Sequence, residues 1–293
     1  MNSDRPTNEA PSSVGTEPVS IVGPIAIIGA GAMGGAILNG LLAPTVQVSG
    51  GIRVTNRTEG KASPLRRRGV TSTALESDPA ANHNAVRGAS IVLLGVKPVM
   101  IGDTLAQLAP ALDASALVIS LAAGIPTSAM EAIVPNAVLR AMPNTPAMVG
   151  RAVTGLAAGP RATAEHRALG AALFGTVGEV VEVNESQIDA LGTISGSGPA
   201  YVFYFIEQLA ETAARLGFTA EQSRAMVVGT FAGSMELLAQ SGRPPAELRA
   251  QVTSPNGTTQ RAVEQLQAAD LGGIFDRATA AALARAREMA AGG

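Results

Sequence analysis

The feature that most constrains the fold of this chain is a glycine-rich turn that directly follows a short apolar run. Residues 24–28 read Pro-Ile-Ala-Ile-Ile, and residues 29–34 read Gly-Ala-Gly-Ala-Met-Gly. A continuous apolar run of this length is typical of a parallel strand that is covered on both faces. Residues 32–42 then carry apolar side chains at helical spacing. A strand, a Gly-x-Gly-x-x-Gly turn and a helix in this order predict the first unit of a dinucleotide-binding α/β domain.

The three glycines of this turn have separate physical roles. Gly29 permits the tight turn, Gly31 lets the backbone approach a pyrophosphate, and Gly34 lets helix and strand pack closely. An ordinary turn is the alternative in a chain with 33 glycines, but a second strand about 20 residues later favours the dinucleotide site. The cofactor contacts predicted in this segment are Ile28, Gly29, Ala30, Gly31, Ala32, Met33 and Gly34.

The end of the second predicted strand, residues 52–55, indicates which nicotinamide cofactor binds. NAD sites usually place Asp or Glu there to accept a hydrogen bond from the ribose 2′-hydroxyl. This chain has Asn56 and Arg57, which can donate hydrogen bonds to a 2′-phosphate that a carboxylate would repel. The following segment is also basic, although residues 66–68 read as a solvated helix face. We therefore predict NADPH as the cofactor, with NADH as an alternative, and Asn56 and Arg57 as ribose contacts.

Strands and helices alternate over about 160 residues from this turn onward. Further strands are predicted at residues 89–96, 116–121, 137–142, 153–158 and 179–183, the last two as edge strands, with helices at residues 61–69 and 99–109. The alternation predicts a Rossmann-type domain over residues 21–183, with a doubly wound, mostly parallel sheet. Two loops follow strands at the edge where such sheets bind ligands. They add the predicted cofactor contacts Val96, Lys97, Pro98, Ala122, Ala123 and Gly124. A surface lysine is the alternative interpretation of Lys97.

The chain changes character after Val183. Asn184 and Gln187 form a helix-start pattern, and helices are predicted at residues 199–216, 220–240, 258–268 and 275–291, separated in part by Gly272 and Gly273. We predict an all-α domain over residues 184–293. Its apolar and alanine surface exceeds what about 110 residues bury alone, which predicts pairing with a second copy. Residues 1–20, rich in Ser, Pro, Thr, Asn and Glu, are predicted to be a disordered extension.

Composition excludes several other functions. The chain is 46% hydrophobic, but its apolar runs are far shorter than the roughly 18–20 residues that cross a bilayer. The net charge of -2 gives no general attraction for nucleic acid. Without cysteine there is no disulfide, thiol nucleophile or thiolate metal site, and no metal is predicted. The first twenty residues lack a secretory signal pattern, so we expect a cytoplasmic protein without membrane or nucleic-acid partners.

Two segments of the helical domain are candidates for substrate binding. Residues 195–201 read Ser-Gly-Ser-Gly-Pro-Ala-Tyr, and residues 254–260 read Ser-Pro-Asn-Gly-Thr-Thr-Gln. Each is either a helix cap or a place where free amides bind a substrate carboxylate. From residue 167 onward the chain has neither His nor Lys, so the usual base for alcohol oxidation is missing. Imine reduction needs less, because a protonated C=N bond is already electrophilic and the product amine keeps that proton.

Six segments together resemble the ordered motifs of the pyrroline-5-carboxylate reductase family, from about residue 24 to about residue 291. They are residues 28–33, 96–98, 122–124, 142–146, 195–201 and 254–259. The last two, in a helical C-terminal domain, are the most specific. The resemblance implies NADPH-dependent reduction of 1-pyrroline-5-carboxylate to L-proline, the last step of proline biosynthesis.

The resemblance also implies the roles of the second loop. The substrate would lie against Ser254, Gly257, Thr258 and Thr259, with the amides of both threonines near its carboxylate. The hydroxyl of Thr259, the implied catalytic residue, would hold the ring nitrogen. Family members form interleaved homodimers, often five dimers in a ring (a decamer), so the cofactor and substrate loops of one site would come from different chains.

Two departures and two alternatives accompany the resemblance. Asn256 replaces the usual glycine of the substrate loop, and Asn is among the residues that best tolerate positive φ. Gly242 stands where some relatives have a glutamate, so no acid is assigned there. The alternatives are an NADPH-binding redox sensor and a hydroxy-acid or prephenate-type dehydrogenase on the same architecture. The missing His and Lys count against the dehydrogenase, and the second anion-binding loop counts against the sensor.

Overall fold

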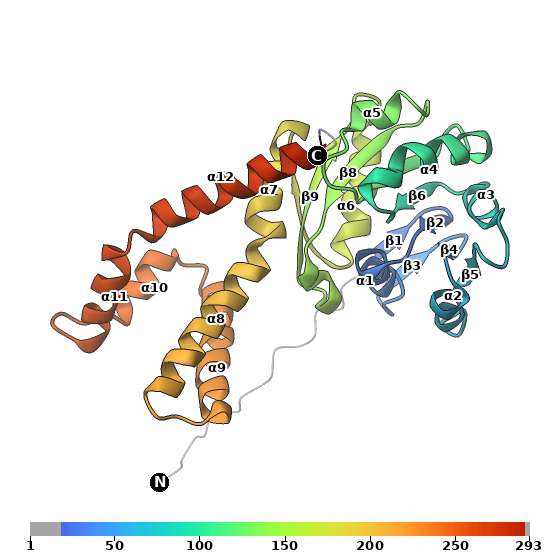
Figure 1. Cartoon of the computed structure of the whole chain (residues 1–293). Helices are drawn as coiled ribbons and strands as arrows, with labels where there is room; N and C mark the ends of the chain where they lie inside the picture. Colours follow the sequence, from blue (N-terminus) through green and yellow to red (C-terminus); the bar gives the residue numbers. More distant parts are fainter. Residues whose placement is uncertain (1–18, 291–293) are drawn as a thin grey trace, which may run out of the picture.

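A large mixed sheet forms the core of the computed structural model, which describes residues 19–290 (Figure 1). The strands are β1 (Val19–Ile21), β2 (Ile25–Ile28), β3 (Val46–Val48), β4 (Ile52–Asn56), β5 (Thr71–Ala74), β6 (Ile91–Leu94), β7 (Leu117–Ser120), β8 (Val138–Met142), β9 (Ala152–Ala158) and β10 (Gly178–Glu182). Eight strands pair in the order β10-β9-β8-β7-β6-β2-β4-β5, and only β8 and β9 are antiparallel neighbours. β1 and β3 form a separate parallel pair.

Helices cover both faces of this sheet. They are α1 (Ala32–Leu41), α2 (Glu59–Arg66), α3 (Ala81–Val86), α4 (Ile101–Leu108), α5 (Thr127–Glu131) and α6 (Ala164–Gly175). Ile27 of β2 belongs to the apolar core that includes Phe174 of α6, whereas Ile28 belongs to the core that includes Leu105 of α4. Successive strand residues point to opposite faces, so a run buried on both sides must be apolar throughout. The predicted doubly wound Rossmann-type fold is confirmed.

The strand order places a ligand crevice at the centre of the sheet. From β2 the chain passes to β4 and β5 on one side, and then returns to β6 on the other side. The carboxyl ends of β2 and β6 therefore flank the point at which the winding direction reverses, where open α/β sheets bind their ligands. The loops after β2, β4, β6, β7 and β8 all lie at this edge, because these strands are parallel.

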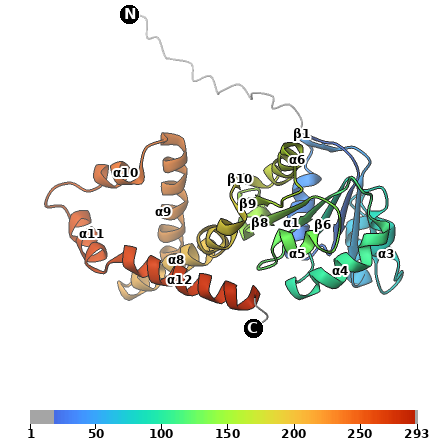
Figure 2. The same cartoon turned by 90° about the horizontal axis from the view of Figure 1, so that it is seen from above.

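The C-terminal region is entirely helical and projects away from the sheet (Figures 1 and 2). It consists of a 3-10 turn (Glu185–Gln187), α7 (Ile188–Leu191), a π-helical turn (Gly192–Gly196), α8 (Gly198–Arg215), α9 (Ala220–Ser241), α10 (Pro245–Gln251), α11 (Thr258–Ala268) and α12 (Leu271–Ala290). The N–H of Asn184 donates to Oε1 of Gln187 at 3.1 Å, which confirms the predicted helix start. α12 runs back to contact α7 and the π-helical turn.

The projecting helices expose large apolar side chains. Phe203 of α8, Leu216 after it and Met235 of α9 are 65%, 73% and 61% exposed. Large apolar side chains exposed on two helices that pack against each other are typical of a protein interface. They therefore support the predicted pairing with a second copy. Within residues 19–290 no helix combines the length and apolarity needed to cross a membrane.

Several elements differ from the prediction. Of the two strands predicted at the edge, β10 is an edge strand, but β9 lies inside the sheet between β10 and β8. α12 begins at Leu271 and includes both glycines that were expected to separate helices. The break lies instead at Asp270, which has a φ of 51° and accepts a hydrogen bond at 3.2 Å from the N–H of Gly273. Of the predicted disordered extension, residues 1–18 lie outside the described residues, and Val19 and Ser20 begin β1.

Candidate functional site

The glycine-rich turn joins β2 to α1 and leaves the start of that helix open. Gly29 has a φ of 86°, a conformation that favours glycine. A Cβ atom on Gly34 would lie 3.0 Å from the carbonyl oxygen of Gly29, so the helix packs closely on the turn. A Cβ atom on Gly31 would meet nothing within 4 Å, and no side chain caps α1. The first N–H groups of α1 thus face open space of the kind that binds a pyrophosphate.

The other predicted residues of this segment lie around the same opening. Ile28 is buried at the end of β2, so only its main chain can face a ligand. Ala30 and Met33 pack partly against the core, whereas Ala32 is exposed at the first turn of α1.

Asn56 and Arg57 lie together at the carboxyl end of β4. Asn56 is 5% exposed, and its buried Nδ2 has no hydrogen-bond partner within the described chain. Arg57 follows it and is exposed. A buried donor without a partner beside an exposed guanidinium fits a ligand with many acceptor oxygens, as a phosphorylated ribose has.

Two basic residues of α2 and the turn after it, Arg66 and Arg68, have partners within the protein. Arg66 pairs with Glu59 and donates to the carbonyl of Ser72 at 2.8 Å. Arg68 donates to Oδ1 of Asn39 at 2.7 Å. Their partners agree with the alternative that this face does not contact the cofactor.

The loop after β6 contacts the glycine-rich turn. The loop after β7 lies at the same carboxyl ends of the parallel strands. A Cβ atom on Gly29 would lie 3.2 Å from Cγ1 of Val96, so the loop after β6 touches the turn. The N–H of Ala122, after β7, donates to Oγ of Ser120 at 3.2 Å and lies in the buried end of that strand. Lys97 and Ala123 are exposed at this edge. The position of Lys97 suits the predicted ligand contact, and its exposure is also that of a surface lysine.

Asn144 connects the crevice edge to the helical region. It follows β8, is 7% exposed, and its Nδ2 donates to the carbonyl of Ser195 at 2.9 Å. Its Oδ1 accepts from the N–H of Val153 at 2.9 Å. The phenol of Tyr201 donates to the carbonyl of Thr193 at 2.9 Å, across the start of α8. Residues 195–201 thus form a hydrogen-bonded junction between sheet and helices.

The second predicted loop opens α11. The N–H of Gly257 donates to the carbonyl of Ser254 at 3.0 Å, and Asn256 has a φ of 59°. The expectation that Asn256 can replace glycine in this turn is confirmed. Thr258 and Thr259 are exposed in the first turn of α11, which no side chain caps. Their N–H groups are available to an anion.

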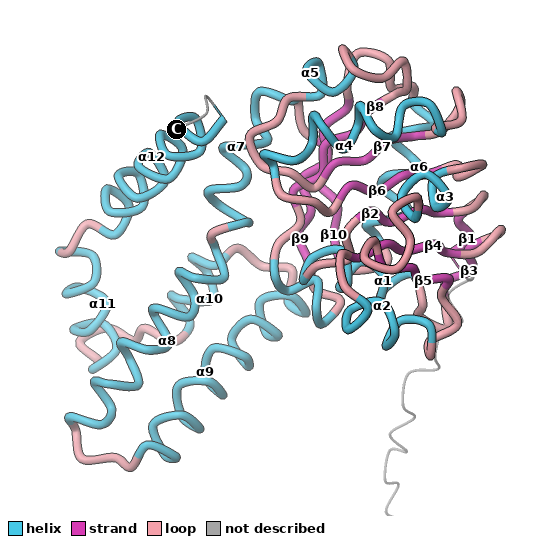
Figure 3. Tube along the Cα trace, turned by 45° about the vertical axis from the view of Figure 1, so that its right-hand side comes forward, coloured by secondary structure: helices cyan, strands magenta, loops and turns pink. Residues whose placement is uncertain are grey.

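A single protomer keeps its two loops apart. α11 lies at the far end of the helical region from β2 and α1 in all three views (Figures 1, 2 and 3). The cofactor contacts gather at the sheet, while Ser254, Gly257, Thr258 and Thr259 gather at the remote end of the helices. A site that contains both loops therefore needs a second chain.

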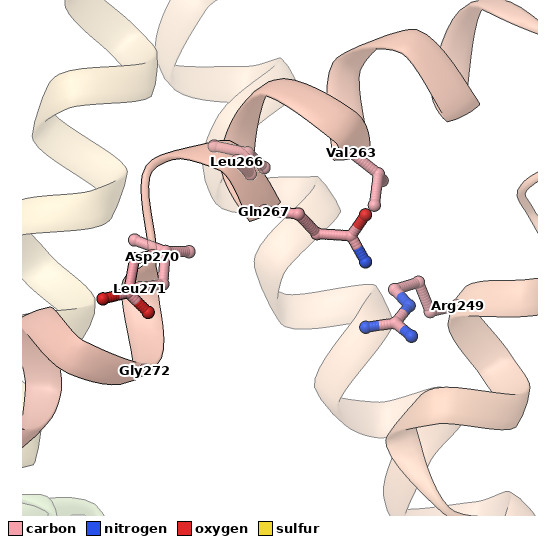
Figure 4. Close-up of a pocket in the computed structure, with 7 residues that line it drawn as sticks. All are labelled: Arg249, Val263, Leu266, Gln267, Asp270, Leu271 and Gly272. Carbon is pink, nitrogen blue, oxygen red and sulfur yellow. The ribbon is translucent and has the colours of Figure 1, made fainter.

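A cavity of about 410 Å³ lies between α10, α11 and the start of α12 (Figure 4). Its lining residues are Arg249, Val263, Leu266, Gln267, Asp270, Leu271 and Gly272. None of them is a predicted site residue. The cavity belongs to the helical region and lies outside the predicted cofactor and substrate residues.

A buried arginine at the base of the helical region was missed by the sequence analysis. The side chain of Arg140 in β8 is 3% exposed and lies 3.3 Å from Oε1 of Glu185 and 2.5 Å from Oδ1 of Asp189. Glu185 also accepts a 2.5 Å hydrogen bond from the hydroxyl of Thr127, at the start of α5. The signal was a single cation inside the apolar run Val138–Met142, since a buried charge must be paired.

An open glycine-rich turn at a switch point, joined to helices with unpartnered apolar faces, defines a dimerising nicotinamide-dependent oxidoreductase. A family model described as "Pyrroline-5-carboxylate reductase dimerisation" matches residues 185–289, and one described as "NADP oxidoreductase coenzyme F420-dependent" matches residues 24–124. A pyrroline-5-carboxylate reductase of Corynebacterium melassecola is 38% identical over 90% of this chain and 98% of its own length. The chain belongs to the pyrroline-5-carboxylate reductase family.

Solved structures agree in both parts of the chain. The pyrroline-5-carboxylate reductase of Coxiella burnetii has a TM-score of 0.83 and 35% identity, over 90% of this chain and 97% of the other. The pyrroline carboxylate reductase of Plasmodium falciparum, solved with NADP bound, has a TM-score of 0.77 and 26% identity, over 91% and 98%. The similarity therefore includes the sheet and the projecting helices.

Proposed function

We propose that this protein reduces the C=N bond of 1-pyrroline-5-carboxylate to L-proline with NADPH, the last step of proline biosynthesis. The observation that carries the proposal is the 38% identity to a pyrroline-5-carboxylate reductase across 98% of that relative. The two family models match the ranges that contain the glycine-rich turn (residues 24–124) and the loop that opens α11 (residues 185–289). The substrate is the named imino acid, held by the loop that opens α11.

The cofactor would lie along the carboxyl edge of the sheet. The open start of α1 would bind the pyrophosphate, and Asn56 and Arg57 would contact the ribose phosphate. Lys97 and Ala123, with their neighbours in the two crevice loops, would line the remaining length. The exposed Arg57 and the unpartnered Nδ2 of Asn56 support NADPH.

The α11 loop would seat the substrate. Free N–H groups of Thr258 and Thr259 bind the carboxylate, and the protonated ring nitrogen donates a hydrogen bond to the Thr259 hydroxyl oxygen. When bound, the nicotinamide supplies a hydride to the C=N carbon. The nitrogen keeps its proton in the product, so no protein base is required. This chemistry agrees with the absence of His and Lys after residue 166.

Purified protein is expected to oxidise NADPH when given 1-pyrroline-5-carboxylate, as followed by NADPH absorbance and by proline formation. Binding of NADPH without turnover would favour the redox sensor. Turnover with 2-keto acids but not with the cyclic imine would favour the hydroxy-acid dehydrogenase.

We also propose that each site is completed by the second copy in a homodimer. Gly31→Asp places a carboxylate in the space for the pyrophosphate, and its φ of -70° accepts any residue. Thr259→Ala removes the substrate hydroxyl. Each variant alone is expected to be nearly inactive. Refolding the two variants together should restore about a quarter of wild-type activity. Random pairing makes half of the dimers mixed, and each mixed dimer has one intact site of its two. No recovery, with mixed dimers shown by mass spectrometry, would place both loops of a site in one chain.

We place the domain boundary between Val183 and Asn184, which the family match beginning at residue 185 supports. We also propose that five dimers form a ring and that the protein is cytoplasmic. Sedimentation of the purified protein would test the ring.

A further inference from the structure

Glu76 lies beside the two residues proposed to hold the ribose phosphate, although it is far from them in the sequence. The N–H of Glu76 donates to the carbonyl of Arg57 at 3.2 Å, and the N–H of Leu75 donates to the carbonyl of Asn56 at 2.8 Å. The chain after β5 therefore continues the pairing of β5 with β4 past the end of both strands. Asn56, Arg57 and Glu76 share the carboxyl edge of the sheet.

The side chain of Glu76 occupies the start of α2. Its Oε1 accepts a hydrogen bond at 2.5 Å from the N–H of Glu59, the first residue of that helix. The N-cap residue, Thr58, provides no side-chain cap. A carboxylate is favoured at this position because the helix dipole and the free N–H groups attract negative charge. The same attraction would act on a phosphate carried by the adjacent ribose.

The charged side chains around the start of α2 differ in whether they have an ion-pair partner. Arg57 and Lys61 are exposed and form no ion pair within the described residues. Glu59 is paired with Arg66. Glu76 is thus a carboxylate at the helix start that forms no ion pair within the described residues, and Arg57 and Lys61 are unpaired cations close to it in the chain or in the strand pairing.

We propose that Glu76 is a specificity-determining residue that lowers the preference of this site for NADPH over NADH. The inference rests on the proposed function. The ribose 2′-hydroxyl of NADH can donate a hydrogen bond to the Glu76 carboxylate, which is the role that an acidic residue has in NAD sites. The 2′-phosphate of NADPH cannot donate at pH 7 in its dianionic form, competes for the same N–H group and is repelled by the carboxylate. Asn56 and Arg57 therefore favour NADPH, whereas Glu76 favours NADH.

Glu76→Gln tests this directly, because glutamine keeps the acceptor oxygen for the Glu59 N–H and removes only the charge. The ratio of kcat/KM for NADPH to kcat/KM for NADH is expected to rise about five- to tenfold, the size expected for charges a few ångströms apart in a partly solvated site. Dissociation constants of NADP⁺ and NAD⁺, measured by calorimetry, should shift in the same direction. Raising the salt concentration should reduce the difference between variant and wild type.

Glu165→Gln is the matched control. Glu165 is also a carboxylate in the first turn of a helix, α6, but that helix starts after β9, at the opposite edge of the sheet. The control removes the same net charge and should leave the cofactor ratio unchanged. An unchanged ratio in Glu76→Gln, or an equal change for both cofactors, would overturn the inference while the reductase activity stands. Absence of turnover with either cofactor in the wild type would instead refute the proposed function.

Discussion

Replacing Thr259 by alanine is expected to lower kcat by about 100-fold while the dissociation constant of NADPH stays within about twofold of wild type. The hydroxyl is proposed to hold the protonated ring nitrogen, so its loss removes an interaction that orients the C=N carbon toward the hydride. Thr259 lies at the exposed start of α11 and is proposed to contact the imine, whereas the proposed NADPH contacts lie on the sheet, so the variant keeps all of them. Stopped-flow measurement of NADPH oxidation in a single turnover separates the chemical step from binding.

Two further variants make the Thr259 test specific. Thr259→Ser keeps a hydroxyl and should retain activity within about tenfold of wild type. Thr279→Ala deletes a hydroxyl in α12 that donates to the carbonyl of Phe275 at 2.8 Å, and should leave kcat unchanged. If Thr259→Ala turns over like wild type, the hydroxyl has no part in holding the imine. A weaker binding of NADPH that accounts for the whole loss would assign Thr259 to the cofactor instead.

The sequence predicted the parts of the site that depend on local pattern. The apolar strand, the turn around Gly29 and the α1 helix are contiguous, so spacing alone identifies them. The conformation of Asn256 was predictable for the same reason, since one turn fixes it. These features need no knowledge of distant parts of the chain.

The features that were missed arise from pairing across the fold. β5 reads Thr-Ser-Thr-Ala, a polar and small-residue strand without the apolar pattern that a search for buried strands detects. Its register beside β4 is what brings Glu76 to the start of α2, 17 residues earlier in the chain. The sequence around Asn56 therefore gave no indication that the Glu76 carboxylate lies nearby. The remote position of α11 likewise follows from how the helices project rather than from any motif.

Replacing Arg140 by methionine is expected to lower the free energy of unfolding by about 3 kcal/mol, toward the lower end of the range for breaking a buried ion pair. The side chain is 3% exposed and contacts Glu185 and Asp189, which are 30% and 29% exposed. Water can reach the two carboxylates after the change, which limits the loss. Urea unfolding, at one protomer concentration because the protein pairs, measures the effect.

Arg167→Met is the control for this prediction, because Arg167 forms a second, exposed ion pair near the junction. Arg167 lies 3.8 Å from Glu182, with side chains 44% and 55% exposed, so Arg167→Met should cost less than about 1 kcal/mol. Asp189→Asn should also be less harmful in the Arg140→Met background than in wild type, because the carboxylate has then lost its partner. Since Glu185 and Asp189 begin the helical region, this bridge anchors the helices to β8. Equal losses for Arg140→Met and Arg167→Met would show that burial at the junction adds nothing, and apolar packing with the hydrogen bonds of Asn144 and Thr127 would then hold the helices in place.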